Sequence, residues 1–542
     1  MFLSTVELIG TDLWCLCLVA GALLSARTLI HWFQLESYQF PGYFRTLRRQ
    51  GLRGWIPGAC LATVVLLTLL AGRIFRSKTS WLLLAISGLV LIATGYGLLL
   101  WSRKQKEKKK LVFTPRVKRL YIVCAIVWTL VFMTAFFLLS QLKASLWINI
   151  GLVLLPLLLP LWIALGGLIA WPIEKGISEI YFRDAQRILR ERPDLIRIGI
   201  TGSWGKTSVK FILGALLSEK YPTLVTPASF NTPMGVTKVI RTQLEPGYRV
   251  FVAEMGARHV GDIKEMCRLV HPHIGLLTSV GPQHLDTFHT QERITKTKYE
   301  LMEAIPEDGT CFFADDDGIV TELWAKTRKE KFLTGLNSKR DDVWVEDLQV
   351  SPSGSHFLLC TAQERIPCET ELLGELNIRN IVLCASVCLK LGLNGREIAR
   401  GIRKLKPVEH RLELKRNPGG FNVLDDAFNS NIRGAKQAFQ TLKQFPGRRL
   451  IVTPGMVELG DQEAELNREF GQAMADCCDE VILVGKKRSE ALRQGLSDQG
   501  FPKERIHVVG SLSEAAQLLG SLVHPGDTVL FENDLPDNYS EE

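Results

Sequence analysis

Residues 199–208, Gly-Ile-Thr-Gly-Ser-Trp-Gly-Lys-Thr-Ser, decide the fold of this chain. They follow a short apolar run at 195–200, which predicts a buried strand, and they run into residues 206–221, whose composition predicts a helix. A glycine-rich turn between a strand and a helix points backbone N–H groups and the positive end of the helix at phosphate groups. The sequence therefore predicts a nucleoside triphosphate site, in which Lys206 neutralises the outer phosphates and the Thr207 hydroxyl holds Mg²⁺.

The spacing of this turn departs from the usual phosphate-loop pattern, because five residues rather than four separate Gly199 from Gly205. A glycine-rich turn without a ligand is the alternative interpretation. The Gly-Lys-Thr run between a strand and a helix favours the nucleotide site. The other residues predicted to form the site are Thr201, Gly202, Ser203 and Ser208.

Length, charge and cysteine content limit the possible functions. A chain of 542 residues is long enough for roughly three or four domains. The net charge of +9 could indicate nucleic-acid binding, but nine basic residues lie at 103–119, between two apolar runs, where Lys and Arg set membrane topology. The twelve cysteines show no paired CxxC spacing, which predicts reduced core residues. We therefore expect no nucleic-acid partner, zinc site or disulfide framework.

Five apolar runs in the first third of the chain each approach the roughly 20 residues that a helix needs to cross a membrane. The first lacks a basic leader and is followed by others, so it does not resemble a cleavable signal peptide. Asp12 within it is expected to be interfacial rather than functional. Pro156 and Pro160 in the last run predict a kink or a re-entrant segment. The predicted spans are 6–26, 54–73, 81–101, 120–142 and 146–171.

Among the loops that join these runs, loops rich in basic residues alternate with loops that contain few. The loop at 27–53 has five arginines and the loop at 103–119 has nine Lys or Arg, whereas 73–80 has three basic residues and the last loop only Lys143. Cytoplasmic loops of membrane proteins are the more basic ones. We therefore expect a multi-pass protein of a bacterial plasma membrane, with the N-terminus outside and everything after Pro172 in the cytoplasm.

Strand and helix signals alternate through the rest of the chain. An amphipathic connecting helix is predicted at 174–192. Apolar runs separated by helical stretches then predict a parallel sheet with helices on both faces, with strands at 249–254, 274–280 and 310–314. A second α/β pattern begins after Pro407, with strands predicted at 422–424, 449–452, 480–484 and 528–531. The predicted fold is an α-helical membrane domain at 1–173, the connecting helix at 174–195, and two α/β domains. The first α/β domain is a P-loop parallel-sheet ATPase core at 196–408, and the second is a Rossmann-like C-terminal domain at 409–542.

Seven further motifs follow the phosphate loop in order: Phe-Asn-Thr-Pro-Met-Gly at 230–235, Glu-Met-Gly-Ala at 254–257, Thr-Ser-Val-Gly-Pro-Gln-His-Leu-Asp at 278–286, Lys-Thr-Lys-Tyr-Glu at 296–300, His-Arg-Leu-Glu at 410–413, Asp-Asp-Ala-Phe-Asn-Ser-Asn at 425–431 and Gly-Met-Val-Glu-Leu-Gly at 455–460. With the loop, they resemble the Mur ligase family, which makes amide bonds in cell-wall precursors, and above all its branch that adds D-alanyl-D-alanine. The resemblance covers about residues 196–533. It implies an ATP- and Mg²⁺-dependent ligase that joins a substrate carboxylate, through an acyl phosphate, to the amine of an amino acid or dipeptide.

The resemblance implies a metal and phosphate site. Thr207, Glu254 and His284 would be Mg²⁺ ligands, Asn231 would lie near the γ-phosphate, and Lys298 would add carbon dioxide to form a carbamate that binds a second Mg²⁺. From the residues alone, a carboxylate that ends a parallel strand can reach a metal, but Glu254 could also be a cap or a solvated carboxylate. His284 alone would be structural more often than a ligand, and Lys298 alone would be a solvated helix lysine. His289 matches no motif and is expected to be structural.

The resemblance also implies contacts from beyond the first α/β domain. Arg411 and Asp426 would approach the phosphates and the ribose of ATP, and Asn380, in Gly-Glu-Leu-Asn-Ile-Arg-Asn at 374–380, would lie near the adenine. Closure of the C-terminal domain would bring Arg411 to the nucleotide and exclude water from the acyl phosphate.

The chain departs from the family pattern at four positions. Trp204 replaces a small or polar residue, Phe313 an Asn, Leu376 a His and Tyr299 a Gly. We expect the first three around the nucleotide pocket, where they spare the phosphate and metal positions.

The family's N-terminal domain, which holds a UDP-sugar, has no counterpart between Pro172 and the phosphate-loop strand. We expect the membrane region to replace it, presenting a lipid-linked acceptor or docking a partner that does. The family's Asp-Asn-Pro-Arg signature for diaminopimelate-type amino acids is also missing, which favours a dipeptide or a small amino acid as the amine donor.

Three other functions fit parts of the sequence. A ligase that makes a γ-linked polyglutamate would also pair a membrane anchor with a Mur-like core, although the C-terminal motifs argue against it. An ATP-dependent transporter or regulator would need paired intramembrane charges and helices broken by Gly and Pro, which the apolar runs lack. A scaffold without catalysis is disfavoured because Lys206, Glu254, His284 and Lys298 are all retained.

Overall fold

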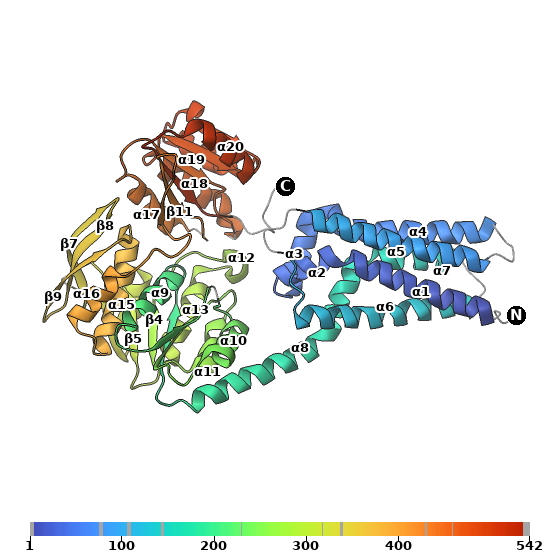
Figure 1. The fold of residues 1–542 in the computed structure, drawn as a ribbon, viewed down its shortest axis with the longest axis horizontal. Coiled ribbons are helices and arrows are strands. Elements are labelled where there is room, and N and C mark those ends of the chain that lie inside the picture. The colour runs from blue at the N-terminus through green and yellow to red at the C-terminus, as the bar shows by residue number, and fades with distance from the viewer. Residues whose placement is uncertain are drawn as a thin grey trace. The chain divides into compact units, whose positions relative to one another are not determined.

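The computed structural model describes residues 5–74, 80–105, 110–141, 146–228, 230–316, 318–336, 340–428, 431–457 and 459–534. Parts of three predicted loops, at 75–79, 106–109 and 142–145, lie outside the described residues, as do Asn429, Ser430 and Glu458 of two predicted motifs. The chain divides into two compact units, one ending at Glu179 and one beginning at Ile180 (Figure 1).

The first unit is entirely helical where it is described. Helices α1 and α5 pack closely, because a Cβ atom on Gly95 would lie only 2.4 Å from the backbone oxygen of Gly21. Such glycine contacts are typical of helix pairs in membranes. The helices are α1 (Thr5–Ser25), α2 (Arg27–Leu35), α3 (Phe40–Gln50), α4 (Ile56–Ile74), α5 (Ser80–Lys104), α6 (Pro115–Gln141), α7 (Leu146–Leu157) and α8 (Leu159–Arg190).

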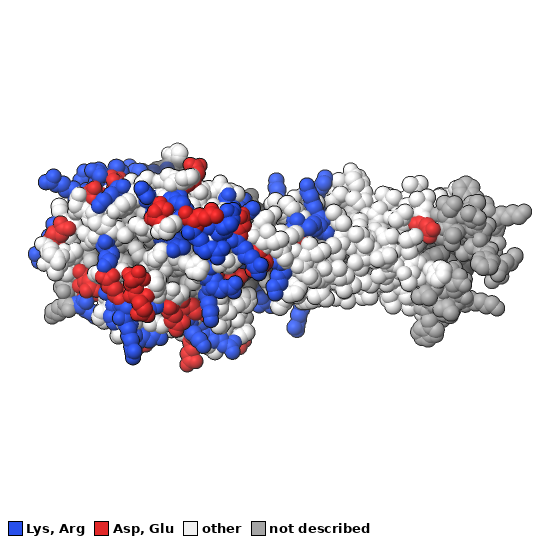
Figure 2. All heavy atoms as spheres, turned by 90° about the horizontal axis from the view of Figure 1, so that it is seen from below, with Lys and Arg blue, Asp and Glu red and all other residues white. Residues whose placement is uncertain are grey.

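Two helices of the described chain, Leu82–Lys104 and Pro115–Ala135, are long and apolar enough by themselves to cross a membrane. The number rises to five if each of three bent helix pairs forms one span, so the five predicted spans equal this upper count. One pair, α7 and α8, bends by 69° between Pro156 and Pro160, as expected where prolines remove helix hydrogen bonds. On the face drawn in Figure 2, the described residues of the helical unit include few charged side chains except near one end.

Helix α8 differs from the prediction of a separate connecting helix at 174–195. It runs without a break from Leu159 to Arg190 and includes Pro172. The change from apolar to charged composition near residue 173 therefore falls inside one helix and is not the start of a new one.

The second unit begins with a six-stranded parallel sheet in the order β2-β3-β1-β4-β5-β6, which confirms the predicted parallel sheet. One buried apolar cluster joins one face of the sheet to α9 and α15, and another joins the other face to α10, α11 and α13. The strands are β1 (Ile196–Thr201), β2 (Thr223–Val225), β3 (Val250–Glu254), β4 (Ile274–Leu277), β5 (Thr310–Ala314) and β6 (Glu330–Thr334). The helices are α9 (Lys206–Leu217), α10 (Pro233–Gln243), α11 (Asp262–Val270), α12 (Leu285–Phe288), α13 (Gln291–Ala304), α14 (Ile319–Lys326), α15 (Glu375–Lys390) and α16 (Gly395–Arg403).

A three-stranded antiparallel sheet, which the sequence did not predict, stands between β6 and α15. Its strands are β7 (Trp344–Ser351), β8 (Gly354–Cys360) and β9 (Arg365–Thr370). It adds Val345, Phe357 and Leu359 to the core beneath α15 and so supports the helix that carries Asn380.

The last sheet is mixed, in the order β10-β11-β15-β12-β13-β14, and only β10 runs antiparallel to its neighbour. The predicted Rossmann-like parallel core is therefore present with an added antiparallel edge. Its strands are β10 (Glu413–Arg416), β11 (Asn422–Asp426), β12 (Arg449–Thr453), β13 (Glu480–Val484), β14 (Ile506–Val509) and β15 (Thr528–Glu532), and its helices are α17 (Ile432–Leu442), α18 (Glu463–Ala475), α19 (Ser489–Asp498) and α20 (Leu512–Leu522).

Candidate functional site

The glycine-rich turn joins β1 to α9 at the carboxyl edge of the first sheet. A Cβ atom on Gly202 would lie 2.1 Å from the Thr278 hydroxyl, so only glycine fits there. Ser203 fastens the turn to the loop after β4, since its backbone N–H donates to Ser279 (2.9 Å) and its hydroxyl donates to Gly281 (2.9 Å). The turn is therefore held in shape without a ligand, as a phosphate-binding loop requires.

Lys206, the first residue of α9, folds back over this loop. Its Nζ donates to the carbonyl oxygens of Gly202 (2.7 Å) and Ser203 (3.0 Å). Burial lowers the pKa of Lys206 to about 8, while the negative charge of Glu254 acts in the other direction. An arriving triphosphate would offer this amine a stronger partner than two carbonyls.

Glu254 ends β3, which lies beside β1, and its carboxylate is almost fully buried. The Thr207 hydroxyl lies 3.2 and 3.1 Å from its two oxygens, and Asn231 Nδ2 donates to Oε1 at 3.1 Å. Three residues predicted from distant motifs thus meet at one carboxylate.

Lys210 is a fourth member of this cluster, and the sequence reasoning missed it. Its Nζ lies 3.0 Å from Glu254 Oε2, and both side chains are buried. The spacing contained a signal, because Lys210 follows Lys206 by four residues and so lies on the same face of α9. Burial lowers the pKa of Lys210 and the Glu254 carboxylate raises it. The ammonium balances a carboxylate that would otherwise be buried without a counter-charge.

The residues present fit Mg²⁺ in part. Among the described residues, no three His, Cys, Asp or Glu side chains gather as metal ligands. Thr207 and Glu254 instead offer oxygen ligands next to the phosphate loop, the type that Mg²⁺ takes together with phosphate oxygens and water. His284 follows β4, on the other side of β1 from Glu254, and adopts a left-handed backbone conformation (φ 52°) at the start of α12. His289 closes this short helix.

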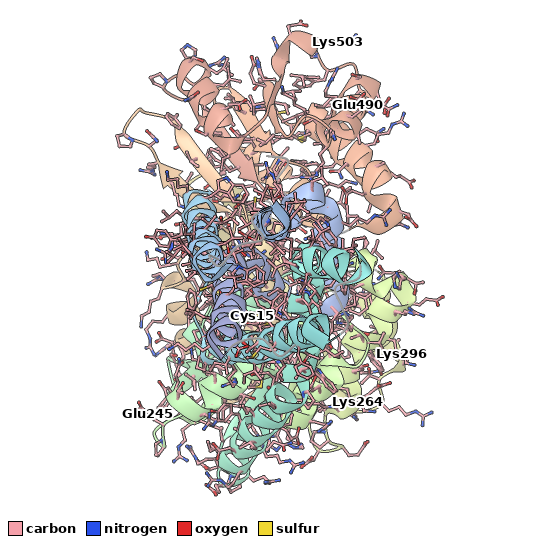
Figure 3. All side chains as sticks on the ribbon, turned by 90° about the vertical axis from the view of Figure 1, so that its right-hand side faces the viewer. Cys15, Glu245, Lys264, Lys296, Glu490 and Lys503 are labelled. Atoms are coloured by element: carbon pink, nitrogen blue, oxygen red, sulfur yellow. The ribbon has the colours of Figure 1, made fainter. Side chains whose placement is uncertain are left out.

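Lys298 lies on α13 and is 2% exposed. Within the described part of the chain, its amine has no hydrogen bond or ion pair. Burial and the nearby positive charge of Lys206 hold the pKa of Lys298 well below its usual value, although Asp262 and Glu254 act in the other direction. By contrast, Lys296 is exposed at the surface (Figure 3). Lys298 is therefore buried, and the alternative interpretation of a solvated helix lysine is wrong.

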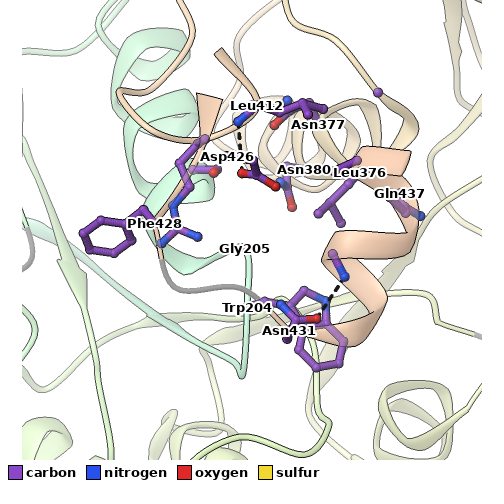
Figure 4. Close-up of a pocket in the computed structure, with 15 residues that line it drawn as sticks. Trp204, Gly205, Leu376, Asn377, Asn380, Leu412, Asp426, Phe428, Asn431 and Gln437 are labelled. Carbon is purple, nitrogen blue, oxygen red and sulfur yellow. Dashed lines mark hydrogen bonds between the residues drawn. The ribbon is translucent and has the colours of Figure 1, made fainter. Parts of the chain in front are cut away.

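A cavity of about 590 Å³, including its open mouth, lies next to the phosphate loop (Figure 4). Gly205 and Ser208 line it from one domain, and Arg411 and Asp426 line it from the other. The structure therefore brings the predicted nucleotide contacts of the C-terminal domain to the phosphate loop.

Asn380 supplies an independent sign of a ligand. It lines the same cavity, is 5% exposed, and its Nδ2 has no hydrogen-bond partner among the described residues. Buried amide groups in proteins are nearly always hydrogen-bonded. A polar ring such as an adenine could accept from this amide.

Asp426 and Arg411 are positioned by the turn that leads into β10. Asp426 Oδ1 accepts from the backbone N–H of Leu412 at 3.0 Å, and the Arg411 guanidinium lies 4.5 Å from the centre of the Phe428 ring. Burial raises the pKa of Asp426 to about 6, and the charge of Arg411 opposes this rise. Burial also lowers the pKa of Arg411.

The residues that depart from the family pattern lie in different parts of the domain. Leu376 and Trp204 line the cavity as expected, and a Cβ atom on Gly281 would lie 2.3 Å from the Trp204 ring, so the indole packs tightly against that backbone. Phe313 contradicts the expectation, because it is fully buried in the core between β5 and the helices. Its ring stabilises the sheet and is not part of the cavity wall.

Two family profiles match the chain. The profile described as Mur ligase middle domain matches residues 200–388, and the profile described as Mur ligase, glutamate ligase domain, matches residues 410–532. The helical unit lies outside both matches.

Curated relatives include UDP-N-acetylmuramoyl-tripeptide–D-alanyl-D-alanine ligases. The enzyme of Bacillus subtilis (strain 168) is 27% identical over 340 residues, which are 62% of this chain and 72% of the relative. The enzyme of Escherichia coli (strain K12) is 28% identical over 329 residues, 59% of this chain and 73% of the relative. The enzyme of Mycobacterium tuberculosis (strain ATCC 25618 / H37Rv) is 30% identical over 356 residues, 61% of this chain and 69% of the relative.

Solved structures show the same fold. MurF from Acinetobacter baumannii superimposes with a TM-score of 0.61 at 24% identity, covering 67% of this chain and 79% of that one. MurF from Thermotoga maritima in complex with ADP superimposes with a TM-score of 0.59 at 24% identity, covering 67% and 82%. Both α/β domains of the chain match, and the mycobacterial relative shares 30% identity over most of its length, so this chain belongs to the Mur ligase family of ATP-dependent amide-bond ligases.

Proposed function

We propose that this enzyme is a membrane-anchored ligase that joins D-alanyl-D-alanine, or a similar dipeptide, to the carboxylate of a cell-wall precursor. One observation carries the proposal: the Lys206, Thr207 and Glu254 cluster adjoins a cavity whose far wall holds Arg411 and Asp426. The names of the relatives specify a muramoyl-tripeptide and D-alanyl-D-alanine as substrates, which supports this choice of acceptor and donor.

The chain's own residues suit the formation of an acyl phosphate. Lys206 would leave the carbonyls of Gly202 and Ser203 and bind the transferring phosphoryl group, while loop N–H groups hold the rest of the triphosphate. Mg²⁺, held by Thr207 and Glu254, would neutralise charge on the phosphate oxygens. A carboxylate oxygen of the acceptor attacks the γ-phosphorus of ATP and ADP leaves. The amine then attacks the acyl carbon, phosphate leaves, and the amine loses a proton as the amide forms.

Lys298 is proposed to carry a carbamate. Carbon dioxide adds only to a neutral amine, and burial and the nearby positive charge of Lys206 favour that form of Lys298. The resulting anion would lie near Lys206, which contributes to the electrostatics of Lys298. Addition of carbon dioxide, with loss of a proton, thus converts a neutral amine into an anion whose charge the Lys206 ammonium would offset.

The helical unit is proposed to anchor the enzyme in the plasma membrane, with the N-terminus outside and the α/β domains in the cytoplasm. The apolar helices and the alternation of basic loops support this placement. Because ATP is cytoplasmic, the catalytic domains would meet their nucleotide there. The acceptor is proposed to be a precursor linked to a membrane lipid. The family profiles cover no part of the helical unit, which stands in the sequence where the family has its UDP-sugar domain, so an acceptor held by the membrane would replace one held by that domain.

Purified full-length enzyme in lipid nanodiscs tests these assignments. We expect phosphate release from ATP only when an acceptor and an amine are both present, with D-alanyl-D-alanine preferred over D-alanine or L-glutamate. We also expect a lipid-linked muramoyl-tripeptide to be preferred over the UDP-linked form. Preference for the UDP-linked form would contradict the lipid-linked acceptor, and a ladder of repeated additions would favour a polymer-forming ligase.

The pKa of Asp426 predicts an acidic limb in the activity profile. As the pH falls through about 6, the carboxylate takes up a proton and can no longer accept hydrogen bonds from two ribose hydroxyls. We therefore expect kcat/KM for ATP, which reports the free enzyme, to fall by about tenfold per pH unit below this value. Asp426→Asn should be less active at pH 7.5 and should lose the limb. An unchanged limb in this variant would show that another group titrates.

A further inference from the structure

The helical unit contains a cavity of its own, with a volume of about 310 Å³ including its mouth. It lies where the end of α2, the start of α3, the start of α6 and the middle of α8 meet. Aromatic rings and two charged side chains line it together: Phe33, Tyr38, Trp171, Arg116 and Glu174. An apolar wall with a few charged groups is the usual composition of a ligand site.

Two arginine side chains lie near the single carboxylate of Glu174, and they bind it unequally. Arg119 satisfies this buried carboxylate with two hydrogen bonds, from Nε to Oε1 (2.5 Å) and from Nη2 to Oε2 (2.8 Å). Arg116 lies farther away, with its Nε 3.8 Å from Oε2, and in the described chain it has no hydrogen-bonded acceptor. One carboxylate therefore faces two guanidinium groups, and the donors of Arg116 are left for an anion.

The position of Arg116 is fixed by packing. Its guanidinium lies 3.9 Å from the centre of the Tyr38 ring, and Tyr38 packs edge-on against Phe33 at 5.5 Å. Gln34 strengthens this wall, since its side chain bonds the Tyr38 hydroxyl at 3.3 Å and both backbone groups of Val112. A guanidinium held in this way loses little freedom when it binds a ligand.

The cavity lies at the level where two apolar helices become charged. Arg116 and Arg119 stand at the start of α6, before its apolar run, and Glu174 follows Trp171 at the end of the apolar run of α8. Lys175 places its ammonium 4.9 Å from the Trp171 ring. Aromatic and basic residues in this order are typical of the membrane interface, where lipid phosphates lie.

We propose that this cavity binds the phosphate-bearing headgroup of an anionic membrane lipid, with Arg116 as the phosphate ligand and the aromatic rings against the adjoining glycerol and acyl carbons. The inference rests on the membrane placement given under Proposed function. A soluble phosphate would offer the same anion, but the aromatic wall and the interfacial level favour a lipid.

Native mass spectrometry of the full-length protein, released from detergent micelles, tests the site. We expect dioleoylphosphatidylglycerol to bind at least tenfold more tightly than dioleoylphosphatidylcholine. Arg116→Gln should remove this preference and Arg116→Lys should keep part of it. Lys118→Gln, which removes one exposed positive charge from the same helix, should keep all of it. The thermal unfolding of each variant is measured to confirm that it is folded.

Other results would contradict the lipid site alone or the site together with the membrane placement. Equal binding of phosphatidylglycerol by the wild type and a folded Arg116→Gln variant would overturn the site, and so would displacement of the lipid by millimolar inorganic phosphate. Recovery of the wild type in the soluble fraction of cells would contradict the membrane placement and the site together. Normal membrane recovery without a preference for phosphatidylglycerol would overturn the site alone.

Discussion

Replacing Lys206 by alanine is expected to lower kcat/KM for ATP by about 10³-fold, the loss that follows removal of one preorganised group that stabilises transferring charge. Among the described residues, this amine donates hydrogen bonds only to the carbonyls of Gly202 and Ser203, and burial disfavours its charged form. The substitution should therefore leave the free energy of unfolding nearly unchanged. The measurement is phosphate release with acceptor and amine both supplied.

Lys264→Ala is the matched control, because Lys264 is exposed on α11 of the same domain (Figure 3). It should retain wild-type activity. If a folded Lys206→Ala enzyme released phosphate at the wild-type rate, the assignment of the phosphate loop as the catalytic ATP site would be wrong.

Replacing Lys298 by alanine is expected to lower kcat by about 10²-fold or more, because the proposed carbamate would hold a second Mg²⁺ that neutralises charge on the phosphate oxygens. Lys296→Ala removes an exposed lysine two residues away on the same helix and should have no effect. Carbon-13 nuclear magnetic resonance of wild-type enzyme in labelled bicarbonate should show a carbamate signal that is absent from the Lys298→Ala variant.

Two further readouts separate a carbamate from a purely structural lysine. Removal of carbon dioxide should reduce wild-type activity reversibly, and a short carboxylic acid in solution should restore part of the activity of the alanine variant. A wild-type enzyme that is fully active without carbon dioxide and shows no carbamate signal would contradict this role.

The strands that carry the site were predictable because they are buried on both faces. A parallel strand covered by helices has a nearly continuous apolar sequence, and the runs predicted at 249–254 and 310–314 lie within one residue of β3 and β5. The antiparallel strands β7 and β9 contain no continuous apolar run, and the run at 357–360 in β8 is only four residues long, which is too short to distinguish a strand from a buried helix segment.

The cluster around Glu254 was predictable in part. Thr207 and Asn231 belong to ordered motifs, whereas Lys210 is visible only when α9 is placed against β3. The burial of Lys298, and of an Asn380 Nδ2 group that has no partner among the described residues, depends on tertiary packing, which no single motif contains.

The apolar runs of the helical unit were visible from composition, but its bends were not all predictable. Prolines mark the bend between α7 and α8. The 45° bend between α1 and α2 falls at Ala26, a fully buried residue without any local signal for a break. Packing of the surrounding helices must determine it, and the cavity around Arg116 follows from that packing.

Transfer of oxygen-18 from the acceptor to phosphate tests the central claim most directly. The acceptor that supports phosphate release is labelled in its carboxylate, and the released phosphate is analysed by mass spectrometry after one turnover. An acyl-phosphate ligase leaves one carboxylate oxygen on the phosphate, so each phosphate should carry a single label when the amide forms. Unlabelled phosphate released together with the amide product would contradict the account.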